Sequence, residues 1–102
     1  MERDKETETQ WIVNGPESFH WAVWDDEEDA VLFHQGSGDT LLVNPLAELI
    51  LRELQKNPKS KADIALAASR YFDIENDEKL ESSIRSTLNA FRTLGLVIRD
   101  SL

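Results

Sequence analysis

The chain has 102 residues, of which 40% are hydrophobic, and this predicts one folded domain with a modest core. Its 20 acidic and 11 basic side chains give a net charge of −9, whereas nucleic-acid binding needs clustered Lys and Arg. The absence of cysteine excludes disulfides, thiolate metal sites and cysteine nucleophiles. No apolar run is long enough for a membrane span or a signal peptide, so we expect a cytoplasmic location.

The N-terminal segment MERDKETETQ is charged and holds no apolar residue beyond Met1. We therefore expect a disordered tail at 1–10 and a single domain at 11–102. The segment WIVNGP at 11–16 indicates a short extended piece that ends in a turn and packs Trp11 on the domain.

Three strands are predicted next. FHWAVW at 19–24 and AVLFHQ at 30–35 alternate with the period of a strand, and the acidic run DDEED at 25–29 connects them. GSGD at 36–39 turns the chain, because glycine accepts a positive φ without strain. TLLV at 40–43 follows as a third strand. The pattern predicts an antiparallel meander with its last strand at an edge.

The register of the first hairpin depends on how its acidic connection closes. Symmetric closure places Trp21 opposite Phe33, with both on the inner face of the sheet. The same closure places His20 opposite His34 on the outer face. Two imidazoles across strands can bind zinc, but the sequence nominates no further ligands. We therefore expect a polar cross-strand pair.

Helices begin after the third strand. Asn44 is suited to cap the first helix and Pro45 to open it, and KNPKS at 56–60 ends it. Ser60 with Asp63 resembles a capping box at the start of the second helix.

The third helix is the longest. Asn76 or Asp77 caps it, Gly95 suits a left-handed stop, and Leu96 supplies the hydrophobic contact of that stop. LVIR at 96–99 is a last extended piece. Apolar side chains at helical spacing should face the core: Leu46, Leu49, Ile50 and Leu54; Ile64, Ala67, Ala68, Tyr71 and Phe72; and Leu80, Ile84, Leu88, Phe91 and Leu94. The order predicts an α+β, winged-helix-like fold, with a three-stranded antiparallel sheet followed by three helices and a helix-turn-helix core.

The run FHWAVWDDEEDAVLFHQGSGDTLLVNPLAELILREL resembles the PqqD-like family of small peptide chaperones. That family has a Leu-Asn pair at the end of its third strand, and here the pair is Val43-Asn44. Its following helix carries an Ala and an Ile-Leu pair, supplied here by Ala47, Ile50 and Leu51. ADIALAASRYFD resembles the second helix of the family, and LESSIRSTLNAFRTLGLV the third.

Within the family, the chain is most similar to the branch associated with HPr-kinase-related gene clusters, on the basis of SGDTLLVNPLA. The family often has Asp-Gly between its first two helices, and this chain has KNPKS there instead. The resemblance implies a RiPP recognition element, which binds the leader of a ribosomally made precursor peptide and presents it to a modifying enzyme. The leader would add as a strand to one edge and lie against the third helix. The implied contacts are Thr40, Leu41, Leu42 and Val43 on the strand, and Arg85, Leu88, Asn89 and Arg92 on the helix.

Two interpretations of the strand at 40–43 stay open from the residues alone. It is either a docking edge or an internal strand paired on both sides, for example with the segment 11–13. Exposed edges are normally protected by Lys, Pro or a bulge, and TLLV carries neither Lys nor Pro. The resemblance favours the docking edge. Arg85, Asn89 and Arg92 are likewise either peptide contacts or an ordinary solvated helix face.

Two other functions compete with peptide binding. A winged-helix DNA-binding regulator would use the third helix as its reader, against the charge of the chain. A protein–protein adaptor would dock an HPr-kinase-like partner without any peptide. An exposed strand could also pair with a second copy to form a homodimer. The sequence has no phosphate-binding loop, nucleophile motif or metal-ligand cluster, so we expect no enzymatic activity, no cofactor and no metal site.

Overall fold

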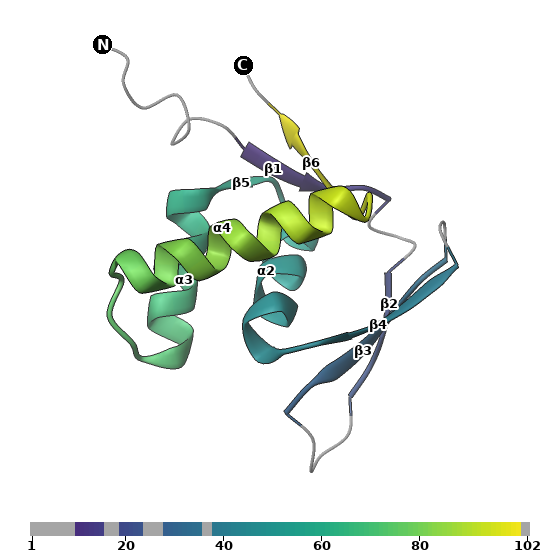
Figure 1. The fold of residues 1–102 in the computed structure, drawn as a ribbon, viewed down its shortest axis with the longest axis horizontal. Coiled ribbons are helices and arrows are strands. Elements are labelled where there is room, and N and C mark those ends of the chain that lie inside the picture. Colours follow the sequence, from purple (N-terminus) through teal and green to yellow (C-terminus); the bar gives the residue numbers. More distant parts are fainter. Residues whose placement is uncertain (1–9, 16–18, 24–27, 36–37, 101–102) are drawn as a thin grey trace.

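A computed structural model of the chain describes residues 10–15, 19–23, 28–35 and 38–100. It has the predicted α+β, winged-helix-like layout, with a three-stranded sheet beside three helices (Figure 1). The elements in chain order are β1 (Gln10–Val13), β2 (Phe19–Ala22), β3 (Ala30–His34), β4 (Asp39–Val43), α2 (Pro45–Lys56), β5 (Lys59–Ser60), α3 (Lys61–Phe72), α4 (Glu78–Thr93) and β6 (Val97–Asp100).

The predicted meander is confirmed. Strands β2, β3 and β4 form an antiparallel sheet in that order, which we call the wing sheet. It extends to one side of the helices, and β4 leads directly into α2 (Figure 1). The central strand is β3, so β4 is an edge strand of this sheet, as the sequence predicts.

The predicted register of the β2–β3 hairpin is wrong by one residue. Trp21 pairs with Leu32, and His20 pairs with Phe33. Because side chains alternate along a strand, this shift reverses the faces of β3: Leu32 and His34 are buried, while Phe33 is 39% exposed. Both faces of β3 carry apolar residues, so hydropathy does not select between the two registers. The two histidines therefore lie on opposite faces and form no cross-strand pair.

A second small sheet forms from segments far apart in the sequence. Its order is β5-β1-β6, with Trp11 paired to Lys59 on one side and to Arg99 on the other. Trp11 is buried, as predicted. The sequence predicts extended pieces at 11–16 and 96–99 but not that they pair. Since β1 lies in this sheet, the possibility that it covers residues 40–43 is wrong.

The predicted helix boundaries are confirmed. Asn44, Ser60 and Asp77 each accept a hydrogen bond from the backbone N–H three residues later, at 2.8, 3.2 and 3.1 Å. At the end of α4, Gly95 has a φ of 82°, and the N–H groups of Gly95 and Leu96 donate to carbonyls of the last turn at 3.0 and 2.9 Å. This pattern is a Schellman motif, which satisfies carbonyls that the helix leaves unpaired.

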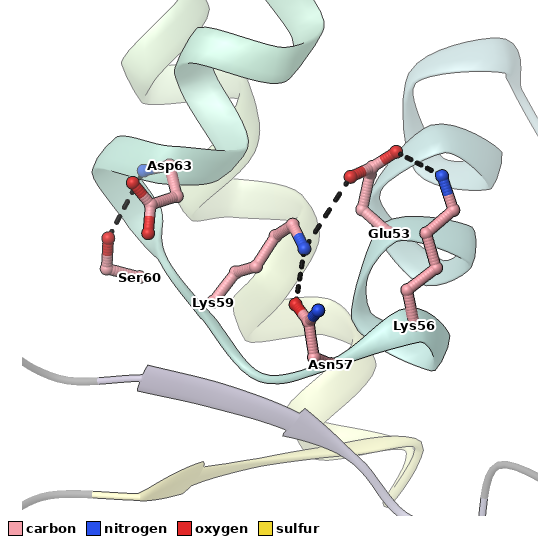
Figure 2. Close-up of polar contacts among 6 residues, drawn as sticks. All are labelled: Glu53, Lys56, Asn57, Lys59, Ser60 and Asp63. Carbon is pink, nitrogen blue, oxygen red and sulfur yellow. Dashed lines mark hydrogen bonds and ion pairs between the residues drawn. The ribbon is translucent and has the colours of Figure 1, made fainter.

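The turn between α2 and α3 is held by side chains of the KNPKS segment at 56–60 and of α2. The Lys59 ammonium group donates to Oδ1 of Asn57 at 2.5 Å and lies 3.7 Å from Oε1 of Glu53 (Figure 2). Lys56 contacts the other oxygen of Glu53 at 3.2 Å. The Lys59 and Glu53 side chains are only 19% and 18% exposed, so salt screens this pair less than a surface pair. KNPKS therefore closes the helix-turn-helix through side-chain contacts.

The core is formed mainly by the three helices, and its predicted members are largely confirmed. In α3 the buried stripe is centred on Ile64 and Ala68, which keeps Phe72 partly inside. Tyr71 lies to the side of that stripe and is 73% exposed, so its predicted core position is wrong. Leu94 was also predicted to be buried, but it is the C-cap residue beyond α4 and is 45% exposed.

Candidate functional site

The outer edge of β4 is the first component of the site. Among the described residues, β4 pairs only with β3, while β1 is held between β5 and β6. Its first half is exposed and Leu42 is 70% exposed, whereas Leu41 is half-buried and Val43 is buried. An edge strand presents unpaired backbone N–H and C=O groups, which can accept another strand.

One face of the wing sheet is covered by the core and the other faces solvent. Leu41 and Val43 point inward and belong to or pack against the core. Leu42 points outward, opposite Val31 of the neighbouring strand. A strand added at β4 would therefore have one row of side chains toward the helices and one row toward solvent.

An apolar pocket of about 610 Å³ opens directly after β4. It begins at the first two residues of α2, and α3, the following loop and α4 complete it. Its apolar lining consists of Pro45, Leu46, Phe72, Ile74 and Leu80. Its polar lining consists of Glu75, Asp77, Lys79 and Ser83. The pocket is large enough for an apolar side chain with its backbone.

The helix residues predicted for the site are not equivalent in the structure. Leu88 is fully buried and packs in the core, so it has no surface to offer a ligand. Arg85, Asn89 and Arg92 are exposed. Arg85 lines a smaller hollow of about 340 Å³ with Glu78, Lys79 and Ser82.

The pocket is lined by one flank of α4. Lys79 and Ser83 are four residues apart, share that flank, and line the pocket beside the end of β4. With 3.6 residues per turn, Arg85 and Arg92 are rotated by roughly a third of a turn or more from them. The pocket residues Lys79 and Ser83 thus lie on a different flank of α4 from the residues that the family resemblance implies.

The pocket is not predictable from the sequence pattern, although several of its lining residues are predicted to face the core. Leu46, Phe72 and Leu80 each lie at a helix end, where an apolar side chain has neighbours on only one side. An apolar residue in the connection after α3, Ile74 at 46% exposure, was a usable signal.

In the described parts of the chain, no three His, Asp or Glu side chains come together as metal ligands. None of the helices that the structure describes has both the length and the apolar composition needed to cross a membrane.

Comparison with protein families gives a match to the family of coenzyme PQQ synthesis protein D (PqqD) over residues 29–97. This span includes most of the wing sheet and all three helices. The chain belongs to the PqqD family. The predicted resemblance is therefore confirmed at the level of the family, while the HPr-kinase-related branch stays a prediction. No curated protein matches the chain.

Two solved structures share the fold of this PqqD-family chain. "TbiB1 in Complex with the TbiA(beta) Leader Peptide" is 19% identical, with a TM-score of 0.64, covering 84% of this chain and 93% of that one. "Lasso peptide synthetase B1 complexed with the leader peptide" is 22% identical, with a TM-score of 0.62, covering 86% and 96%. At these identities the likeness shows the common fold.

Proposed function

We propose that this PqqD-family domain binds a leader peptide as an additional strand on β4 and presents it to a modifying enzyme. The open edge of β4 in the described part of the chain is the observation that carries the proposal. The two proteins that share the fold were each solved with a leader peptide, which supports the same ligand class here.

The size of the site suits reversible binding. Four or five main-chain hydrogen bonds contribute about 1 kcal/mol each, and one apolar side chain in the pocket contributes about 1.5–3 kcal/mol. The sum of about 6–8 kcal/mol corresponds to dissociation constants in the micromolar range. Such affinity allows a peptide to be delivered to an enzyme and then released.

Each part of the site has a proposed role. The backbone from Thr40 to Val43 supplies the hydrogen bonds, and the pocket beyond Val43 receives an apolar side chain of the peptide. Arg85, Asn89 and Arg92 are proposed contacts for carboxylate or amide groups of the peptide, because they are exposed cationic or amide side chains on one flank of α4. Leu88 contributes by packing only.

The partner is proposed to be a modifying enzyme or an HPr-kinase-like protein, and the domain itself is proposed to perform no chemistry. A short precursor reading frame beside the gene would support the peptide chaperone. An HPr-kinase-like neighbour without any precursor frame would support the adaptor instead.

Selection from a display library of random peptides tests the function without knowledge of the natural client. Peptides are selected on the wild-type chain and measured against two variants by calorimetry. Leu42→Pro removes a backbone donor of β4, whereas Leu42→Ala keeps that donor and removes the exposed side chain. Circular dichroism checks that the helices of both variants are intact.

We expect selected peptides to bind the wild-type chain and Leu42→Ala similarly, and to bind Leu42→Pro at least about tenfold more weakly, equivalent to about 1.4 kcal/mol. Equal affinity for Leu42→Pro and wild type, or a selection that enriches no peptide, would show that β4 is not a docking edge.

A further inference from the structure

Among the described residues, His34 is a polar residue that is buried in the core. Its side chain is 6% exposed, at a position of β3 where strand alternation would normally place an apolar residue. Its Nε2 lies 3.2 Å from the carbonyl oxygen of Asn14, and its ring meets Phe19 edge-on at 5.0 Å. Since a carbonyl oxygen only accepts, Nε2 carries the hydrogen of this bond.

Asn14 connects His34 to the end of α4. The Asn14 N–H donates to the carbonyl oxygen of Leu96 at 2.8 Å, and its side-chain Nδ2 donates to that of Gly95 at 3.1 Å. These carbonyls belong to the turn that terminates α4. A continuous path of hydrogen bonds therefore runs from the wing sheet through Asn14 to α4.

The position of His34 along the wing sheet matters for β4. His34 pairs with Asp39, the first residue of β4. The other end of β4, Val43, is fixed by the chain itself, which continues through Asn44 into α2. The two ends are roughly 13 Å apart at 3.3 Å per residue. The contact to Asn14 thus links the starting end of β4, through His34, to the turn that ends α4.

A second contact of the wing sheet does not replace this one. The Trp21 indole N–H donates to Oε1 of Gln55 at 2.9 Å, and the Arg52 guanidinium lies 4.4 Å from the Trp21 ring centroid. Both partners belong to α2, so this contact fixes the wing sheet on α2. The hydrogen bonds of Asn14 instead link the wing sheet to the turn that ends α4.

We propose that His34 is a positioning residue for peptide binding: through Asn14 it holds the starting end of β4 at a set distance from α4. This inference rests on the proposed function and adds a residue to it. A peptide must contact β4 and α4 at the same time. If the wing sheet moves relative to α4, the chain is able to bind the peptide for only part of the time. Apparent affinity falls in proportion to the competent fraction.

The experiment uses a matched pair of substitutions. His34→Leu keeps the apolar packing and removes the hydrogen bond to Asn14. His20→Leu is the control, because His20 is exposed on the opposite face of the wing sheet and bonds to Gln35 at 3.1 Å. His34→Gln restores a side-chain amide donor and serves as the rescue.

The first readout is a distance that needs no peptide. The chain has no cysteine, so Phe33→Cys and Ser86→Cys introduce two unique spin-label sites, on the outer face of the wing sheet and on α4. Pulsed electron paramagnetic resonance should give one narrow distance distribution for wild type and His20→Leu. We expect His34→Leu to broaden or shift it and His34→Gln to narrow it again. An unchanged distribution in His34→Leu overturns the inference.

The second readout is affinity for a display-selected peptide, measured without spin labels. We expect about a tenfold loss in His34→Leu, corresponding to a competent fraction of about one tenth, and recovery in His34→Gln. A broadened distance with wild-type affinity would show that the contact is only structural. If the wild-type chain bound no peptide, the proposed function would fail, while the distance readout would still decide whether His34 holds β4 against α4.

Discussion

Leu88 shows that the resemblance and the structure assign different roles to one residue. The resemblance implies a place on a groove wall with Arg85, Asn89 and Arg92, whereas helical spacing predicts a core position, and Leu88 is fully buried. The N-caps and Gly95, in contrast, were predictable, because capping depends on a few adjacent residues. The hydrogen bond of His34 was not, because its partner Asn14 lies 20 residues away.

Leu88→Ala should lower the free energy of unfolding by about 2–5 kcal/mol, since it leaves a cavity in a closely packed core. Urea denaturation followed by circular dichroism measures the change. Asn89→Ala is the matched control on the exposed face of the same turn, with an expected change within about 0.5 kcal/mol. Equal small effects would contradict a core position for Leu88.

Gly95→Ala should cost about 1–2 kcal/mol. Gly95 has a φ of 82°, and residues with a side chain adopt such a left-handed conformation at a cost of about 1–2 kcal/mol. A Cβ at this position would have no atom within 4 Å, so a substitution causes no clash. The whole effect is therefore conformational. Thermal denaturation checks it, with Gly95→Asn expected to lose less because Asn tolerates the left-handed region better. A larger loss in Gly95→Asn than in Gly95→Ala would contradict this explanation.

At the scale of elements, the sequence identified each helix and strand of the wing sheet but not the register or the pocket. A register shift of one residue keeps the composition of β3 and reverses which of its faces is buried, so tertiary packing decides the register and no local pattern does. The pocket forms where the ends of three helices meet, and no local pattern encodes that meeting.

Ser83→Phe should fill the pocket from α4 and weaken a display-selected peptide by about tenfold, because the peptide would lose the apolar burial available there. The double variant Arg85→Ala with Arg92→Ala should have a smaller effect that shrinks with added salt, since exposed charges are screened. Calorimetry at two salt concentrations measures both. A larger loss for the double variant than for Ser83→Phe would place the peptide on the other flank of α4.

At the scale of the whole molecule, the fold class was predictable because three strands precede three helices in the family order. The second sheet was not, because it joins segments from the two ends of the chain and its middle. Winged-helix-like folds also occur in DNA-binding proteins, so fold alone does not decide function. The net charge of −9 opposes binding to phosphates and is the reason for preferring the peptide-binding proposal.

A gel shift with mixed-sequence duplex DNA at low salt should therefore show no complex, even though low salt favours non-specific binding. A basic winged-helix protein run in parallel serves as the positive control. A retarded band that weakens with added salt would favour the DNA-binding regulator over the peptide chaperone.

The most direct test of the account is amide hydrogen exchange measured by NMR with and without a display-selected peptide. Successive amides of an edge strand point alternately toward its neighbour and away from it, so part of β4 should exchange freely in the absence of peptide. We predict that the peptide slows exchange at the outward amides of Asp39–Val43 and leaves β6, the edge of the second sheet, unchanged. A peptide that binds while exchange across Asp39–Val43 stays the same would contradict strand addition at β4.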